Sequence, residues 1–270
     1  MIHYLWTLDG GRLRYQSSHA HGNLNWIFVP GGPGLGSEAL NDLTKLLKAE
    51  IPGTIWHFDF PNDGSNILDD KSIFNWRSSL IQAISAFEKV VLVAHSTPGM
   101  YVQTMPELEG MLEGLVLVGS APDARWQQSF DVYCQNNTDI HIKNAEEKYI
   151  KNPTDETLRT LLISAANYCF VSEQSLAKGI ELFKRIPVNH SANALSSKIF
   201  DTENYQASWI PEKVATLIMA GDKDIITPLN LFKDELNYQK KNIILKRISE
   251  AGHYPWIENP IEVRDSFKEF

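Results

Sequence analysis

The sequence has few cysteines and no long apolar run. Its two cysteines, Cys134 and Cys169, cannot build a disulfide framework, and we expect both thiols to be reduced and packed in the interior. No window reaches the roughly 18 consecutive apolar residues that a membrane-spanning helix needs. The N-terminal residues lack the basic stretch and apolar core of a signal peptide. These absences predict a cytoplasmic protein without a membrane span.

Positive charge and ligand-binding signatures are also scarce. The 25 lysines and arginines are outnumbered by 33 aspartates and glutamates, which gives a net charge of -8. This balance argues against a nucleic-acid partner, because phosphate binding relies on clustered basic residues. The His, Cys and Asp residues show no metal-ligand spacing, and neither glycine-rich nucleotide motif is complete. We therefore expect no metal, no cofactor and no nucleic acid.

Apolar runs of strand length alternate with segments of helical periodicity along most of the chain. This alternation is typical of a parallel sheet whose two faces are both covered by helices. The sequence therefore predicts an α/β fold with a mostly parallel central sheet of about eight strands flanked by helices. The expected strands are residues 2–8, 12–16, 25–29, 54–60, 90–94, 115–119, 216–220 and 243–248. Helices are expected from about residue 37, after residue 96, and over residues 72–88, 228–239 and 260–270.

The middle segment, residues 121–206, contains no convincing strand. Trp126 and Phe130 recur at helical spacing, Pro153 is expected at the first position of one helix, and Ser172 opens another. We interpret this segment as a helical cap inserted late in the sheet, between a core formed by residues 1–120 and 207–270. The alternative is a structural elaboration remote from the chemistry.

Ser96 is a candidate nucleophile because a buried strand ends and a helix begins around it. On such a turn the hydroxyl is lifted away from the backbone, and the helix N-terminus offers N–H groups to a developing oxyanion. The residues two before and two after it must be compact, and here they are Ala94 and Pro98. Taken alone, this match is loose, and a serine that merely caps the helix is the simpler interpretation.

Two later segments strengthen the case for a nucleophile. A serine hydroxyl needs a base to take its proton, and that base needs a third group to orient it. Asp222 and Asp224 follow the strand predicted at 216–220, and His253 follows the last strand. In a parallel sheet these loops lie at the same edge as Ser96. The sequence therefore predicts a Ser–His–Asp site, with either aspartate as its acid.

Four segments in this order resemble the motifs of the α/β-hydrolase family. They are Gly31-Gly32-Pro33-Gly34, Ala94-His95-Ser96-Thr97-Pro98-Gly99, Gly221-Asp222-Lys223-Asp224 and Gly252-His253. The resemblance covers about residues 1–120 and 210–270.

The resemblance implies a role for each matched residue. Ser96 is implied as the nucleophile, Asp224 as the orienting acid and His253 as the general base. The backbone N–H groups of Gly32 and Thr97 are implied as the oxyanion hole. Family spacing favours Asp224 over Asp222, and Asp123 is a further alternative because some relatives place the acid there. The neighbouring His95 is expected to pack rather than react.

The chain departs from the family at two prolines. Pro30 stands where many relatives have histidine. That histidine supports the glycine-rich loop in the relatives, so its loss is expected to affect the geometry of the loop more than the mechanism. Pro98 stands where relatives have glycine. If Thr97 is the N-cap, Pro98 falls at the favoured first helical position, but proline also disfavours helical dihedrals at the preceding Thr97. Because Thr97 is an implied oxyanion donor, Pro98 is expected to affect activity more than stability.

These features lead to one main function and two alternatives. The main hypothesis is a serine hydrolase that cleaves a small carboxylic ester or related acyl substrate through an acyl-serine intermediate. Proline-iminopeptidase-like or C–C bond hydrolase activity is the second, and a non-catalytic homologue that binds a small ligand, weakened by Pro98, is the third. The expected substrate contacts are Trp126, Phe130 and Tyr254, although cap aromatics also serve as core. The only expected partner is a small-molecule acyl substrate, bound by a monomer or homodimer.

Overall fold

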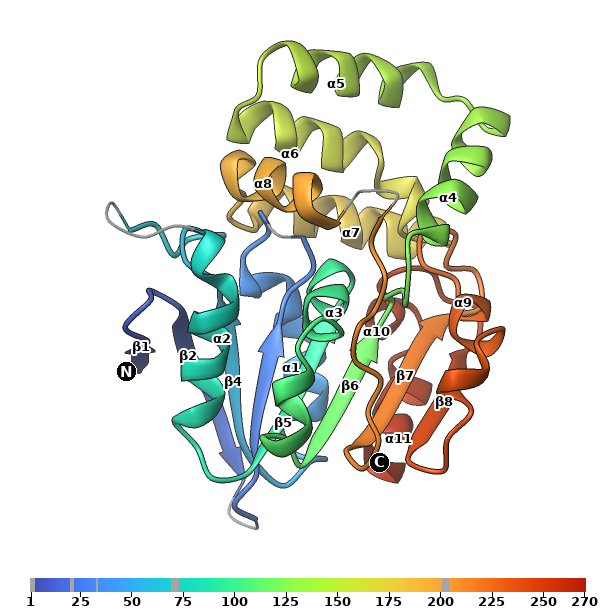
Figure 1. Cartoon of the computed structure of the whole chain (residues 1–270). Helices are drawn as coiled ribbons and strands as arrows, with labels where there is room; N and C mark the ends of the chain where they lie inside the picture. The colour runs from blue at the N-terminus through green and yellow to red at the C-terminus, as the bar shows by residue number, and fades with distance from the viewer. Residues whose placement is uncertain (1–2, 20–21, 33, 69–72, 201–203) are drawn as a thin grey trace.

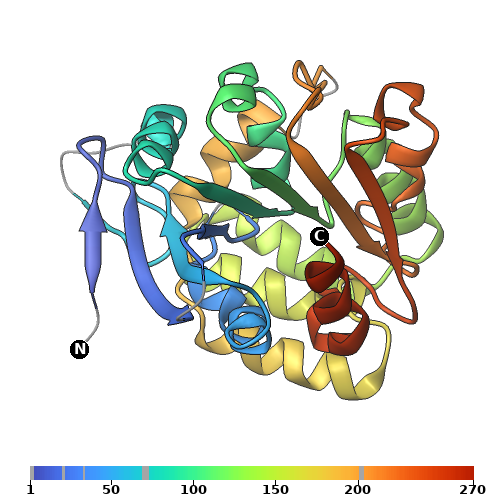
Figure 2. The same ribbon diagram turned by 90° about the horizontal axis from the view of Figure 1, so that it is seen from below.

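The central sheet has eight strands in the order β1-β2-β4-β3-β5-β6-β7-β8. The computed structural model describes residues 3–19, 22–32, 34–68, 73–200 and 204–270. β1 and β2 pair antiparallel with each other, β2 pairs antiparallel with β4, and the remaining neighbours are parallel (Figures 1 and 2). The strands are Tyr4–Trp6, Arg12–His19, Asn25–Val29, Gly53–Asp59, Val90–His95, Gly114–Val118, Ala215–Gly221 and Ile243–Ile248. The predicted α/β fold with a mostly parallel sheet is confirmed.

The central strand β5 shows why both faces of the sheet are buried. Because successive side chains of a strand point to opposite faces, Leu92 and Ala94 pack on one side and Val91 and Val93 on the other. The first side is covered by α2 (Trp76–Ser85), α3 (Thr97–Val102) and α9 (Asn230–Lys233). The second is covered by α1 (Asn41–Leu47) and α11 (Pro260–Glu269).

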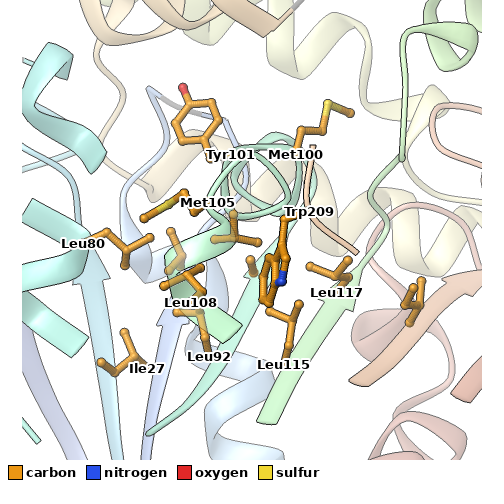
Figure 3. Packing of buried hydrophobic residues seen from close by; sticks show 14 of the residues in the cluster. Ile27, Leu80, Leu92, Met100, Tyr101, Met105, Leu108, Leu115, Leu117 and Trp209 are labelled. Carbon is orange, nitrogen blue, oxygen red and sulfur yellow. The ribbon is translucent and has the colours of Figure 1, made fainter. Parts of the chain in front are cut away.

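Two clusters of buried apolar side chains lie on the two sides of the sheet, and α3 packs on the larger of them. Figure 3 shows Ile27, Leu92 and Leu115 from three adjacent strands beneath α3 and the loop that follows it. All three side chains are fully buried, and burying one leucine or isoleucine contributes about 1.5–3 kcal/mol relative to leaving it exposed. The helix that begins after Ser96 therefore stands on a rigid apolar base.

The segment between β6 and β7 is helical, as predicted. It contains α4 (Arg125–Asn136), α5 (Ile140–Lys151), α6 (Asp155–Ser164), α7 (Glu173–Arg185) and α8 (His190–Phe200). These helices form a layer beyond the carboxyl ends of the parallel strands (Figure 1). We call residues 121–206 the helical insertion; residues 201–203 lie outside the described part of the chain. None of the described helices is both long and apolar enough to cross a membrane.

Several predicted boundaries were wrong. Residues 228–239 split into α9 and a short 3-10 turn because Glu235 is extended, with φ -99° and ψ 111°. α2 covers only part of the helix expected over 72–88, and the short helix α10 (Pro255–Glu258) was not predicted. Ile2 and Ser72, at the ends of two expected elements, lie outside the described residues.

The predicted start of α6 at Pro153 was also wrong. The N-cap is Thr154, whose side chain accepts the N–H of Thr157 in a capping box, so Pro153 precedes the helix. A threonine hydroxyl can accept a hydrogen bond from an unpaired N–H at the helix start, whereas the proline side chain has no hydrogen-bond acceptor. The start predicted at Ser172 is confirmed by a second capping box, formed with Ser175.

Candidate active site

Ser96 lies on a strained turn between β5 and α3. Its backbone has φ 59° and ψ -131°, an uncommon conformation for a residue with a side chain. The turn is held by neighbouring backbone, because the Ser96 N–H donates to Val118 O at 2.9 Å. Gly99 lets α3 approach β6, since a Cβ atom there would collide with Ser120. The sharp turn leaves the Ser96 side chain half-buried rather than enclosed.

The expected position of Pro98 in the helix was wrong by one residue. Ser96, not Thr97, is the N-cap, so Thr97 is the first residue of α3 and Pro98 the second. The missing N–H of Pro98 costs no helical hydrogen bond, because the first four N–H groups of a helix have no partner within it. Thr97 lies inside the helix although proline disfavours helical dihedrals at the residue before it.

His253 connects Ser96 to a buried carboxylate. Its Nε2 lies 3.0 Å from Ser96 Oγ, and its Nδ1 lies 3.0 Å from Asp224 Oδ2. His253 comes from the loop between β8 and α10, and Asp224 from the loop after β7. The His253 and Asp224 side chains are almost fully buried. The structure thus brings together the three side chains that the sequence placed on three separate loops.

Asp224 is built to remain ionised. Its Oδ1 accepts the N–H groups of Ile226 at 2.9 Å and Thr227 at 3.0 Å, and its Oδ2 accepts the Thr227 hydroxyl at 3.1 Å. Burial alone would raise the pKa of Asp224, but His253 and the N–H groups of Thr227 and Ile226 outweigh it and lower that pKa below its usual value. A carboxylate only accepts hydrogen bonds, so the His253 proton sits on Nδ1. Nε2 is therefore free to accept the Ser96 hydroxyl proton.

The carboxylate on His253 belongs to Asp224 rather than to either alternative. Asp222 Oδ1 accepts the Ala251 N–H at 3.4 Å. Asp123 forms two short bonds with Arg125, at 2.9 and 2.6 Å. Asp222 therefore bonds the backbone of the loop after β8, and Asp123 forms an ion pair with Arg125, so neither orients the imidazole.

The glycine-rich loop lies against Ser96. A Cβ atom on Gly31 would stand 3.3 Å from Ser96 Cβ, and Gly32 and Gly34 have φ of +121° and +100°, which favour glycine. The Gly34 N–H donates to the buried Asp63 Oδ1 at 2.6 Å. Pro33 lies outside the described residues. Gly32 thus lies next to Gly31, which contacts Ser96, and the Thr97 N–H has no helical acceptor, as an oxyanion hole requires. Their role stays a prediction.

His95 supports the loop that carries His253. Its Nε2–H donates to the His253 backbone oxygen at 3.0 Å, and its ring packs against those of Tyr254 and Trp256, each with a centroid separation of 4.9 Å. Burial, helped by the charge of His253, lowers the pKa of His95 to about 3. His95 is therefore neutral near pH 7 and packs, as expected.

The three expected substrate contacts lie in different surroundings. Trp126 is half-buried in the first turn of α4, and Phe130, one turn on, meets Tyr168 edge to face at 5.4 Å. Tyr254 is only 3% exposed and stacks on Phe170 at 5.2 Å. Tyr254 thus packs the insertion against the His253 loop, and contact of the three residues with substrate stays a prediction.

Sequence reasoning missed other residues that shape this site. Gly119, at the end of β6, has φ +52°, and a Cβ atom there would lie 3.2 Å from His253 Nδ1 and 3.4 Å from Asp224 Oδ2. Thr227, which bonds Asp224 three residues earlier, and Glu258, which bonds Val171 across 87 positions of the chain, were also not predicted. A glycine directly after an apolar strand was the one available signal. Among the described residues, no cluster of three His, Cys, Asp or Glu side chains could hold a metal ion.

Comparisons with known proteins identify the fold. No protein-family model and no curated protein matches the sequence. A solved alpha/beta fold family hydrolase from Bacillus anthracis superposes with a TM-score of 0.74 at 15% identity, covering 100% of this chain and 98% of that one. A proline iminopeptidase-related protein from Thermus thermophilus gives 0.70 at 18% identity, covering 100% and 96%. A thermophilic esterase from Thermogutta terrifontis gives 0.69 at 14% identity, covering 100% and 97%. With this strand order and these neighbours, the chain has the α/β-hydrolase fold.

Proposed function

We propose that this protein is a serine hydrolase that cleaves a small carboxylic ester or related acyl compound in the cytoplasm. One observation carries the proposal: the continuous hydrogen-bonded chain from Ser96 through His253 to Asp224. It lies at the carboxyl edge of the sheet, where ligands bind in open α/β folds. The two free cysteines suit a reducing compartment.

The proposed reaction has two halves. Ser96 Oγ attacks the substrate carbonyl carbon while His253 Nε2 takes the hydroxyl proton. The ester C–O bond then breaks, and His253 returns that proton to the leaving alcohol, which leaves an acyl group on Ser96. Water attacks this acyl carbon with its proton passing to His253, and the acid departs as Ser96 recovers a proton. Asp224 keeps the imidazole oriented and stabilises its charged form throughout.

The oxyanion of each tetrahedral intermediate is assigned to the N–H groups of Gly32 and Thr97. Two features support this assignment: the positive φ of Gly32 on a loop beside Ser96, and the place of Thr97 at the first position of α3. Loss of one such donor typically costs about 3 kcal/mol in the barrier.

We further propose that residues 121–206 act as a cap over the site. The support is the layer of helices beyond the strand ends, and the direct bond from the His253 N–H to Cys169 O at 2.9 Å. Trp126 and Phe130 on α4 are assigned to the substrate wall, because α4 follows directly from the strand next to β5.

A fluorophosphonate probe tests the nucleophile. The chain offers a matched control, because Ser191 Oγ lies 3.3 Å from His190 Nε2, and His190 Nδ1 lies 2.9 Å from Asp155 Oδ1. This second set is exposed, so it lacks the water-excluding surroundings that strengthen such contacts. The probe should label wild type and Ser191→Ala but not Ser96→Ala. Labelling of Ser96→Ala at the wild-type level would contradict the assignment.

A substrate panel separates the related activities. The solved proline iminopeptidase of Mycobacterium smegmatis covers 100% of this chain with a TM-score of 0.65, so prolyl amides belong in the panel beside p-nitrophenyl acyl esters. We expect ester turnover to dominate and to disappear in Ser96→Ala. Preferential cleavage of prolyl amides would favour the peptidase alternative. Stabilisation by ligand without turnover in wild type would favour the non-catalytic one.

A further inference from the structure

The loop that carries His253 is bonded directly to the helical insertion. The His253 N–H donates to Cys169 O at 2.9 Å, and a Cβ atom on Gly252 would lie only 2.6 Å from the same oxygen. The rings of Phe170 and Tyr254, the residues that follow Cys169 and His253, stack at 5.2 Å. The residues on either side of His253, Gly252 and Tyr254, thus both pack against the helical insertion.

One carboxylate joins the two segments. Glu258 Oε2 accepts the Gly252 N–H at 2.5 Å, next to His253. Its Oε1 accepts the Val171 N–H at 2.7 Å and the Ser175 hydroxyl at 2.5 Å, at the start of α7. Each of these three groups is a donor, so a negative charge with two acceptor oxygens fits this place. The positive end of the α7 dipole favours the same charge.

The far end of α7 reaches the glycine-rich loop. The Gly36 N–H donates to Pro187 O at 3.0 Å, and the Asn189 N–H donates to Gly34 O at 2.8 Å. α7 therefore lies between the two loops on which the proposed chemistry depends. Movement of its first turn would pull on the backbone of His253.

We propose that Glu258 is a positioning residue that holds the His253 loop and the start of α7 in one arrangement, so that the imidazole stays aligned between Ser96 and Asp224. This inference rests on the proposed function for its kinetic consequences, and on geometry alone for the orientation of the ring. Glu258 acts through Gly252 and does not touch the reacting atoms.

Glu258→Gln tests the inference with nearly unchanged volume. The amide group turns one acceptor into a donor, which then faces Gly252 or Val171 without a bond. A misplacement of about 1 Å in a catalytic group costs about 100-fold in rate. We therefore expect kcat on p-nitrophenyl esters to fall about 10- to 100-fold, with KM within about threefold of wild type. Glu258→Asp keeps the charge and should lose less.

Glu262→Gln is the matched control. Glu262 Oε2 also accepts a backbone N–H of this loop, that of Ser249 at 2.8 Å, but it belongs to α11 and lies further from His253 along the chain. The kcat of the Glu262→Gln variant should stay within about twofold of wild type. Equal losses of kcat in Glu258→Gln and Glu262→Gln would overturn the proposal, because a general weakening of the loop would then explain both. Thermal melting shows whether each variant folds, and Glu258→Asp replaces Glu258→Gln if the latter does not.

Nitrogen-15 NMR of the His253 imidazole provides a second readout that needs no substrate. Wild type should show one tautomer with the proton on Nδ1, and folded Glu258→Gln should show a mixture. An unchanged tautomer together with unchanged kcat would overturn the proposal. If wild type neither turns over esters nor reacts with fluorophosphonate, the hydrolase proposal fails, while the tautomer change still decides the role of Glu258.

Discussion

Gly119 shows how much the site depends on a single missing methyl group. It lies where β6 ends, and it faces both His253 Nδ1 and Asp224 Oδ2. Its φ of +52° is left-handed, a conformation that costs other residues about 1–2 kcal/mol. Close approach of the imidazole and carboxylate therefore favours glycine at this position, because a methyl group here would push His253 Nδ1 away by a few tenths of an ångström.

We expect Gly119→Ala to lower kcat more than tenfold, because the added methyl group pushes apart the His253–Asp224 pair. Unfolding should become easier by about 1–2 kcal/mol through the strained backbone. Ester kinetics and thermal melting measure the two effects. Gly110→Ala is the control, since no atom lies within 4 Å of a Cβ built there. Wild-type kinetics in Gly119→Ala would show that the pair tolerates the displacement.

At the scale of one element, the glycine-rich loop is held from two sides. The helical insertion bonds its backbone at Gly34 and Gly36, and Asp63 receives the Gly34 N–H from the core side. Asp63 is 1% exposed and lies in the loop after β4. The position of Gly32 is thus set by residues that the glycine motif itself does not contain.

We expect Asp63→Ala to weaken this loop, because it leaves the buried Gly34 N–H without its acceptor at a cost of about 1–3 kcal/mol. Both kcat/KM on esters and the rate of fluorophosphonate labelling should fall about tenfold or more. Asp63→Asn keeps an amide oxygen in place of Oδ1 and should retain most activity near pH 7. Equal activity of the alanine variant and wild type would exclude a role for Asp63 in shaping the loop.

At the scale of the whole molecule, three buried groups set opposing responses of stability to pH. Burial, and to a lesser extent the Arg14 charge, holds the pKa of His57 well below its usual value, and that of His95 is about 3. Burial raises the pKa of Asp63 to about 8, despite the N–H donors Gly34 and Gly64 and with help from the Asp59 charge. The folded state therefore binds fewer protons at the histidines than the unfolded state, and more at Asp63.

We expect thermal stability to rise from about pH 4 to pH 6.5 and to fall from about pH 6.5 to pH 8. Below pH 6.5 the unfolded histidines take up protons that the folded ones refuse, so acid favours unfolding. From about pH 4 to pH 8 folded Asp63 keeps a proton that the unfolded aspartate has lost, so rising pH favours unfolding by at most ~1.4 kcal/mol per pH unit. The two histidines outweigh this effect below pH 6.5, and the effect of Asp63 dominates above it. Melting temperatures across this range should show a flatter alkaline side in Asp63→Asn. An identical decline in that variant would assign the effect to another group.

The sequence by itself determined the order of the eight strands along the chain, many of the helices, and the three loops that carry Ser96, Asp224 and His253. This was possible because a buried parallel strand is apolar throughout, and because a nucleophile turn and the loops that follow such strands have local patterns. It also identified the start of α7 at Ser172, since a capping residue acts within one turn of the helix.

Only the tertiary structure decided the contacts between distant segments. Asp222 and Asp224 lie two residues apart, and the choice between them depended on which side chain the fold turns toward His253. Glu258 bonds Val171, which lies 87 positions away along the chain, and no local sequence pattern predicts that hydrogen bond. The place of Gly119 in the site became visible only when the fold brought His253 and Asp224 next to it. Side chains that act through long-range packing are set by the three-dimensional arrangement of the elements, whereas a capping residue such as Ser172 acts within one turn and follows a local pattern.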